Sequence, residues 1–231
     1  MHATDIAAAV AAVGLTLRGG FHPDAADGVP ALPDGRPAAS LLLVGTVGAA
    51  AWPAFATAPE TADGLPDPLD RWTRRLLGGL AAEFGATPLF PFGAPPFLPF
   101  QRWAMRAEPV APSPLGILIH PDHGLWHAYR GALAFAVRLD LPPRSRRPHP
   151  CDRCPDRPCL AACPVGAFVA GGYDVAACLG HISGAAGADC MELGCRARRA
   201  CPVGREHAYP PDQAAVHMRA FRRAASGRAA P

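Results

Sequence analysis

The eight cysteines of this 231-residue chain are confined to positions 151–201, and no cysteine precedes them. They form two runs, each ending in a Cys-Pro pair, with one isolated cysteine between the runs. In chain order they are Cys151, Cys154, Cys159, Cys163, Cys178, Cys190, Cys195 and Cys201. Because a [4Fe–4S] cluster is held by four thiolates, eight cysteines in this pattern predict two such clusters. The chain is therefore predicted to carry a redox module joined to a cysteine-free segment.

The segment 162–167 (ACPVGA) resembles the Cys-Pro signature of two-cluster ferredoxins. In those proteins the cysteine before each proline ligates the other cluster. The resemblance therefore implies a first cluster held by Cys151, Cys154, Cys159 and Cys201, and a second held by Cys163, Cys178, Cys190 and Cys195. The spacing departs from the ferredoxin pattern, in which two residues separate neighbouring cysteines among the first three of a run. Residues 155–158 place four residues between Cys154 and Cys159, and the two gaps of the second run contain four and five residues. This departure indicates that the second site is altered or labile.

Two other uses of the cysteines are open at this stage. Zinc also binds paired cysteines, and the spacing of the first pair fits a zinc knuckle. Four disulfides would need an oxidising compartment, and no signal peptide is visible. The longest apolar run, residues 38–51, is too short to span a bilayer, so we expect a cytoplasmic protein. We expect His149, His181 and His207 to lie at the surface or beside the ligands, because the cysteines already complete two sets of four.

The charge of the chain is unevenly distributed. Residues 1–143 carry 9 Arg against 12 acidic residues, and residues 144–231 carry 13 Arg against 7 acidic residues, within a net charge of +3. A basic C-terminal part is compatible with nucleic-acid binding. Two clusters with thiolate ligands would add negative charge to the same part, so the pattern favours internal compensation, or docking of an acidic redox partner protein, over nucleic acid.

The cysteine-free segment contains signals for both helices and strands. The apolar segment 40–47, bounded by turn residues, predicts a buried strand, and 116–120 predicts a second one. Asp67 and Pro68 predict the start of a helix that ends before Gly85. Its apolar residues recur at helical spacing, which predicts one buried face made of Leu69, Trp72, Leu76, Leu80 and Phe84.

These signals predict an α+β protein with more than one domain. The predicted division is residues 1–143 for an α+β domain, 144–150 for a proline- and arginine-rich linker, 151–211 for a ferredoxin-type domain with two [4Fe–4S] clusters, and 212–231 for a C-terminal helix and tail.

The segment 115–141 resembles the cobalamin-processing chaperones, which carry a similar pattern of Ile-His-Pro, Trp and Arg-Gly. The order of this segment and the eight cysteines is also similar to that of epoxyqueuosine reductases and reductive dehalogenases. The resemblance implies a nitroreductase-like N-terminal domain that binds a corrinoid, with His120, Trp126 and Arg130 as contacts. The residue types alone leave structural roles open: a hydrogen-bonded His, a packed Trp, and a buried Arg paired with an acid such as Asp122.

The same resemblance implies an iron–sulfur redox protein that passes single electrons through two clusters to a corrinoid. The alternative is a ferredoxin-like electron-transfer protein whose N-terminal domain is non-catalytic and docks a partner. In epoxyqueuosine reductases a catalytic aspartate precedes an aliphatic-Pro-Val segment, whereas residues 106–110 here read RAEPV. Arg106 lies nearest the position of that aspartate, so the sequence assigns no catalytic residue. Glu108 is expected to be a solvent-exposed carboxylate.

Overall fold

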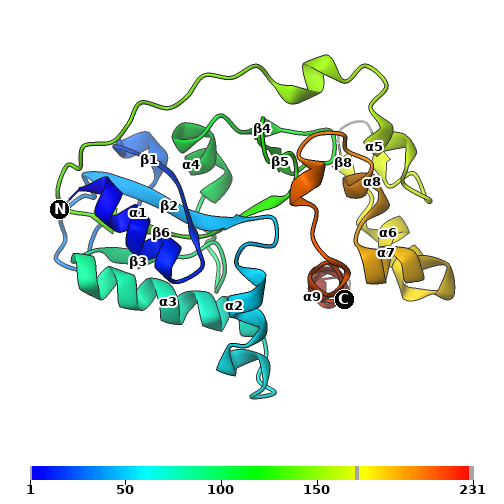
Figure 1. Ribbon diagram of the computed structural model, residues 1–231, viewed down its shortest axis with the longest axis horizontal. Helices are drawn as coiled ribbons and strands as arrows, with labels where there is room; N and C mark the ends of the chain where they lie inside the picture. The colour runs from blue at the N-terminus through cyan, green and yellow to red at the C-terminus, as the bar shows by residue number, and fades with distance from the viewer. Residues whose placement is uncertain (1, 170–171, 229–231) are drawn as a thin grey trace. The chain divides into compact units, whose positions relative to one another are not determined.

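The computed structural model describes residues 2–169 and 172–228, so the end of the predicted C-terminal tail lies outside the described residues. The chain divides into two compact units (Figure 1). The first comprises residues up to Pro109 together with His127–Arg147, and the second comprises Val110–Trp126 together with the chain from Pro148 onward. The division after Arg147 falls within the predicted linker. Residues 110–126, however, belong to the cysteine-bearing unit.

The first unit contains a four-stranded antiparallel sheet with the strand order β1-β2-β6-β3 (Figure 1). Its strands are β1 (Thr16–Phe21), β2 (Ser40–Val47), β3 (Thr87–Leu89) and β6 (His127–Phe135). Its helices are α1 (Ala3–Ala12), α2 (Trp52–Ala56), α3 (Pro68–Phe84) and α4 (Phe100–Ala107), with 3-10 turns η1 (Ala25–Asp27) and η2 (Pro59–Thr61). The predicted α+β class is confirmed.

Strand β2 forms the centre of the core, and the predicted strand 40–47 is confirmed. Leu42 and Val44 pack with side chains of α1, α3 and β6 in the main apolar cluster. Leu41 and Leu43 point to the opposite face of the sheet and are equally buried. Helix α4 contacts both β1 and β2. A strand buried on both faces reads as a continuous apolar run, which is why the sequence shows no alternation here.

Helix α3 has the predicted bounds, but Asp67 does not cap its first turn as predicted. Asp67 precedes the helix in a left-handed conformation (φ 51°), and its side chain accepts no capping hydrogen bond. Gly85 ends the helix at φ 64°, as predicted. The fully buried face consists of Trp72, Thr73, Leu77, Leu80 and Ala81, so the predicted stripe is rotated slightly; Leu69, Leu76 and Phe84 pack at its margin.

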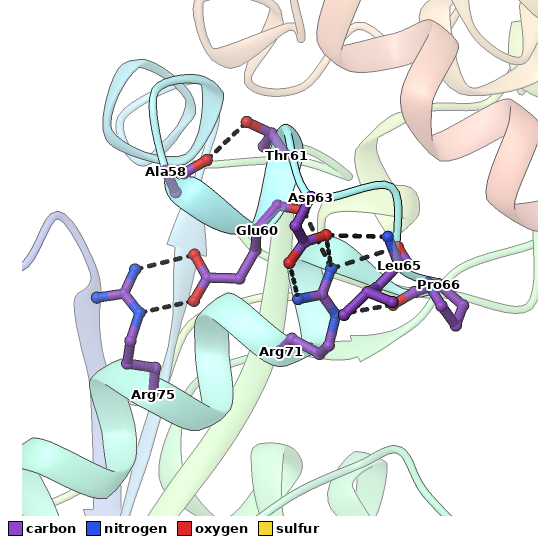
Figure 2. A network of polar contacts seen from close by, with 8 residues as sticks. All are labelled: Ala58, Glu60, Thr61, Asp63, Leu65, Pro66, Arg71 and Arg75. Carbon is purple, nitrogen blue, oxygen red and sulfur yellow. Dashed lines mark hydrogen bonds and ion pairs between the residues drawn. The ribbon is translucent and has the colours of Figure 1, made fainter.

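Two arginines of α3 hold the preceding loop in place (Figure 2). Arg71 donates to both carboxylate oxygens of Asp63 at 2.6 and 2.7 Å. Arg75 forms a paired contact with the two oxygens of Glu60 at 2.6 and 3.0 Å, and this hydrogen bonding lowers the pKa of the Glu60 carboxyl. The two pairs do the anchoring that the Asp67 cap was expected to do.

The second unit is built from short elements. Its strands are β4 (Ala111–Pro112), β5 (Leu118–Ile119), β7 (Phe168–Val169) and β8 (Gly172–Tyr173), paired as β4-β5 and β7-β8. Its helices are α5 (Pro158–Ala161), α6 (Val175–Ser183), α7 (Ala188–Leu193), α8 (Arg196–Arg199) and α9 (Pro211–Arg228). The 3-10 turns are η3 (Pro150–Arg153), η4 (Ala185–Gly187) and η5 (Arg205–His207). In the described part of the chain, no helix is long and apolar enough to cross a membrane.

The predicted strand 116–120 is shorter than expected. Only β5 pairs in a sheet, with β4, because His120 turns back on itself through paired backbone hydrogen bonds with Gly124. The predicted C-terminal helix is confirmed, and it runs from Pro211 to Arg228 as α9.

A buried ion pair lies between β1 and the end of α4. The side chain of Arg18 is 1% exposed and donates to both oxygens of Glu108 at 2.9 and 2.8 Å. Its remaining nitrogen donates to the backbone oxygen of Thr46 at 3.0 Å, and the Tyr129 hydroxyl donates to Glu108 at 2.6 Å. The expectation that Glu108 is a solvent-exposed carboxylate is therefore wrong, because this side chain is 13% exposed and fully paired.

Replacing Arg18 by methionine is expected to lower the free energy of unfolding of the first unit by about 3–5 kcal/mol, because Glu108 would stay buried without its counter-charge. The control is Arg36→Met, which breaks an exposed ion pair in which two guanidinium nitrogens donate to one oxygen of Asp34. That control is expected to change stability little. Urea unfolding followed by circular dichroism measures both. Equal losses in the two variants would contradict the role assigned to the buried pair.

Candidate metal centre

The second unit brings the eight cysteines together as two sets of four. A small cavity of about 20 Å³ is lined by Cys151, Cys154, Cys159 and Cys201. A larger cavity of about 390 Å³ is lined by Cys163, Cys178, Cys190 and Cys195. The last cysteine of each run thus lines the cavity of the other run. This grouping is the one that the ferredoxin resemblance implies.

Short turns and helices place the first set. Cys151 lies in η3, where the preceding His149 accepts a hydrogen bond from its backbone N–H at 3.1 Å. Cys154 ends that turn, and Cys159 lies in α5. Between them, residues 155–158 form the widened gap of the first run, in which Arg157 adopts φ 38°. The extra residues therefore form a tight loop, and the wider spacing still brings the third cysteine to the cavity.

The second set comes from four separate places in the chain. Cys163 follows α5, Cys178 lies in α6, Cys190 lies in α7, and Cys195 immediately precedes α8. Helix α6 begins with a side-chain N-cap: the Asp174 carboxylate accepts a hydrogen bond from the Ala177 N–H at 2.9 Å. Cys178, the isolated cysteine, therefore reaches the cavity from a helix of its own, which lies between the two cysteine runs in the sequence.

All eight cysteines are free thiols, so the structure gives the four-disulfide alternative no support. The backbone N–H of Ala167 donates to the Cys163 sulfur at 3.3 Å. Backbone N–H groups of Leu160, Ala197 and Val203 are likewise directed at cysteine sulfurs and lower their pKa values. Such donors suit anionic sulfur ligands.

Burial outweighs these donors and raises the pKa of five of the thiols. Desolvation is the largest cause for Cys151, Cys159, Cys178, Cys195 and Cys201, and the neighbouring cysteines raise the pKa values of these thiols further. The raised pKa values favour the protonated form of these five thiols. Binding of a metal that requires thiolates would displace those protons.

Zinc and an iron–sulfur cluster make different demands on the spacing of four thiolates. Zinc–sulfur bonds of about 2.3 Å place two thiolates of one ion within about 4.6 Å of each other. Among the described residues, no three His, Cys, Asp or Glu side chains are grouped so that they could hold a single metal ion. Four thiolates are also the donor set of a [4Fe–4S] cluster, whose irons occupy separate corners and keep their ligands farther apart.

Gly124 and Gly204 allow residues 110–126 to pack against the loop that follows Cys201. Both have positive φ angles, 56° and 67°. A Cβ atom on Gly124 would lie 1.9 Å from the backbone oxygen of Val203, and one on Gly204 would lie 2.3 Å from the backbone of His123. This close backbone approach explains why Val110–Trp126 belongs to the cysteine-bearing unit, and sequence spacing gave no signal of it.

The predicted corrinoid contacts His120 and Trp126 lie in the second unit and are engaged by protein groups. The Nδ1 atom of His120 accepts hydrogen bonds from the backbone N–H groups of Asp122 and His123, which holds the turn. The ring of Trp126 is 4% exposed and lies under the guanidinium of Arg198, at 4.6 Å. The indole Nε1 of Trp126, however, is buried and has no hydrogen-bond partner in the described part of the chain.

The third predicted corrinoid contact, Arg130, lies in the first unit. A bulge shifts the pairing of β2 with β6, so that Val44 faces Gly131 while Gly45 faces Tyr129, and Arg130 is the extra residue. Its guanidinium pairs with Asp70 of α3, not with Asp122. The sequence identified a buried arginine that needs an acidic partner, but the choice of partner depended on a bulge that the sequence does not reveal.

Arg106, at the position expected for the catalytic aspartate of epoxyqueuosine reductases, is also engaged. It forms ion pairs with Asp24 and Asp27 of the first unit, and its guanidinium lies 4.8 Å from the ring centre of Phe21. Arg106 and Glu108 are therefore both paired within the first unit, and neither is a free acid or base.

Two residues of the larger cavity had weak or no signals in the sequence. Tyr173 of β8 lines this cavity together with Cys178. His181 was expected near the ligands, and it lines the same cavity. The spacing of Cys178 and His181 by three residues on one helix would have indicated that they share a face.

Neither a protein-family model nor a curated protein matches this chain. Solved structures of epoxyqueuosine reductases share its fold. A selenomethionine-labelled reductase aligns over 92% of this chain and 68% of its own, with 14% identity and a TM-score of 0.54. The Bacillus subtilis reductase, solved with its catalytic loop swung out of the active site, aligns over 92% of this chain and 70% of its own, at 14% identity and a TM-score of 0.52. The Streptococcus thermophilus reductase aligns over the same shares at 17% identity, with a TM-score of 0.50.

Replacing Gly124 by alanine is expected to destabilise the second unit by at least about 2 kcal/mol, because strain at positive φ adds to a backbone clash. Gly116→Ala is the control: Gly116 also has a positive φ, of 74°, but a Cβ there meets no atom within 4 Å. The control should lose only about 1 kcal/mol. Urea unfolding of both variants gives the comparison. Similar losses would show that the contact with Val203 is unimportant.

Proposed function

We propose that this protein is an iron–sulfur electron carrier whose second unit holds two [4Fe–4S] clusters. The observation that carries the proposal is the division of eight free cysteines between two cavities, four to each, with the last cysteine of each run lining the other cavity. When bound, each cluster supplies reversible one-electron chemistry. In this proposal the partner is a redox protein, and the cytoplasm keeps the thiols reduced before loading.

Arginines near the two cavities suit this cofactor. Arg157 lines the first cavity, and Arg196 and Arg198 line the second. Arg198 is held in place, since it donates to the backbone oxygen of Leu125 at 3.1 Å through Nε. A cluster with four thiolates is anionic, so fixed guanidinium groups offset the cost of holding it in a partly buried site. The basic character of the C-terminal part is thus assigned to charge compensation within the protein.

The fold likeness supports the same assignment at the level of architecture. Epoxyqueuosine reductases share the fold over 92% of this chain. We assign a ferredoxin-like arrangement to the second unit and a nitroreductase-like arrangement to the first. The first unit contributes a buried core and paired ionic groups, and this proposal gives it the role of docking a partner.

A corrinoid acceptor is not part of the proposal. Arg130 is paired with Asp70, and Nδ1 of His120 accepts two backbone hydrogen bonds, whereas the buried Nε1 of Trp126 has no hydrogen-bond partner in the described part of the chain. The contacts of Arg130 and His120 give no support to a corrinoid site, and no step is assigned to one.

Exchange of Cys201 for serine is expected to remove the cluster of the first cavity and leave that of the second, because Cys201 completes the set of Cys151, Cys154 and Cys159. Exchange of Cys190 should have the opposite effect. Each variant should lose about four of its iron atoms and one of two paramagnetic resonance signals after reduction. Loss of the same signal in both variants would contradict the crossed ligand sets.

Titration of the loaded protein with hydroxocobalamin, without oxygen and then with a low-potential reductant, is expected to show no saturable change in the cobalamin spectrum. Reduction should bleach the iron–sulfur absorption, and reduced cobalamin should form no faster than in a control without the protein. Saturable binding, with reduced cobalamin formed only when both cysteine sets are intact, would contradict the exclusion of a corrinoid and restore it as the electron acceptor.

A further inference from the structure

The two cavities differ in the side chains that can donate hydrogen bonds to sulfur. Besides its cysteines, the first cavity is lined by Arg157 and by five residues without a polar side chain: Pro114, Ile119, Pro150, Pro202 and Val203. The second cavity is lined by Tyr173 and His181 in addition to Arg196 and Arg198. The identical sets of thiols therefore lie in different polar surroundings.

Tyr173 lines the second cavity together with Cys178, so its hydroxyl can donate to a sulfur held there. The ring is held in position by stacking on Phe168 of the neighbouring strand β7, with ring centres 5.0 Å apart, and by the nearby ring of Phe221 at 6.1 Å. The direction of this donor is thus fixed by packing on its ring.

His181 offers a second donor that lacks an acceptor. It lies one turn after Cys178 in α6, so both side chains lie on the same face of the helix. Its Nε2 atom is buried and has no hydrogen-bond partner within the described part of the protein. Buried polar atoms without partners are rare and call for an explanation. A sulfur atom held in the cavity that His181 lines would supply the missing acceptor.

Hydrogen bonds to the sulfurs, nearby charge and exposure to solvent set the reduction potential of a cluster. The reduced cluster carries one more negative charge than the oxidised cluster, so donors and cations stabilise it more. Tyr173, His181 and Arg198 of the second cavity all act in the same direction, whereas the charge of Arg196 is offset by its ion pair with Asp189. The first cavity has one arginine and no comparable neutral side-chain donor in its lining.

We propose that Tyr173 and His181 raise the potential of the cluster in the second cavity above that of the first, so that the second cluster accepts the first electron. The inference rests on the proposed two-cluster function. In this step an external low-potential reductant, such as dithionite, gives up one electron, and the second cluster changes from its 2+ to its 1+ core. No bond is formed or broken.

The test is a reductive titration of the loaded protein, with dithionite added in steps and paramagnetic resonance recorded at each potential. The signal that Cys190→Ser lacks identifies the second cluster. In the unmodified protein, this signal should appear first. Tyr173→Phe and His181→Leu should each shift its appearance to lower potential, and the double variant should shift it further, while the other signal stays in place.

Two further variants separate the proposed role from a structural one. Tyr209→Phe removes a hydroxyl from a buried tyrosine of the same unit that is not part of either cavity lining, and it should leave both potentials unchanged. His181→Gln keeps an N–H donor and should recover part of the shift seen with leucine, at equal iron content.

Unchanged potentials in Tyr173→Phe and His181→Leu, equal shifts of both signals, or first reduction of the other cluster would overturn the inference while leaving two clusters established. Absence of the second signal from the unmodified protein would instead contradict the proposed function itself, together with the inference that rests on it.

Discussion

The second unit depends on burying thiols that repel one another once they ionise. Eight cysteines line two cavities, and burial together with neighbouring sulfurs raises the pKa of several of these thiols. Such an arrangement is costly for thiolates unless a cation offsets their charge. The short helices, the Cys-Pro turns and the close approach of Gly124 to Val203 all serve to bring ligands from distant parts of the chain to these cavities. The fold of this unit is therefore explained by what the sulfurs must hold.

In the first unit, buried charged side chains pair with one another. Arg18 and Glu108 pair under Tyr129, and Arg130 pairs with Asp70. Arg130, the ionic group that the sequence resemblance assigned to a corrinoid, is thus paired with a protein carboxylate. The likeness to epoxyqueuosine reductases therefore extends to the fold, while these charged contacts give no support to carrying over their chemistry.

The sequence predicted the features that depend on residues close together in the chain. The bounds of β2 and α3 followed from an apolar run and from Pro68 and Gly85, whose backbone preferences are intrinsic. The grouping of cysteines followed from their order and from the Cys-Pro resemblance. Long-range contacts were not predictable in this way. The partner of Arg130 depends on a bulge in β6, and the burial of Glu108 depends on an arginine ninety residues away in the chain.

The central claim is that two cubane clusters occupy the two cysteine sets. The most direct measurement is iron and sulfide analysis, with Mössbauer spectroscopy, of protein loaded without oxygen. The account predicts about eight iron and eight sulfide ions per chain, all with the spectrum of [4Fe–4S] centres. About four of each, or tightly bound zinc in place of iron, would contradict it.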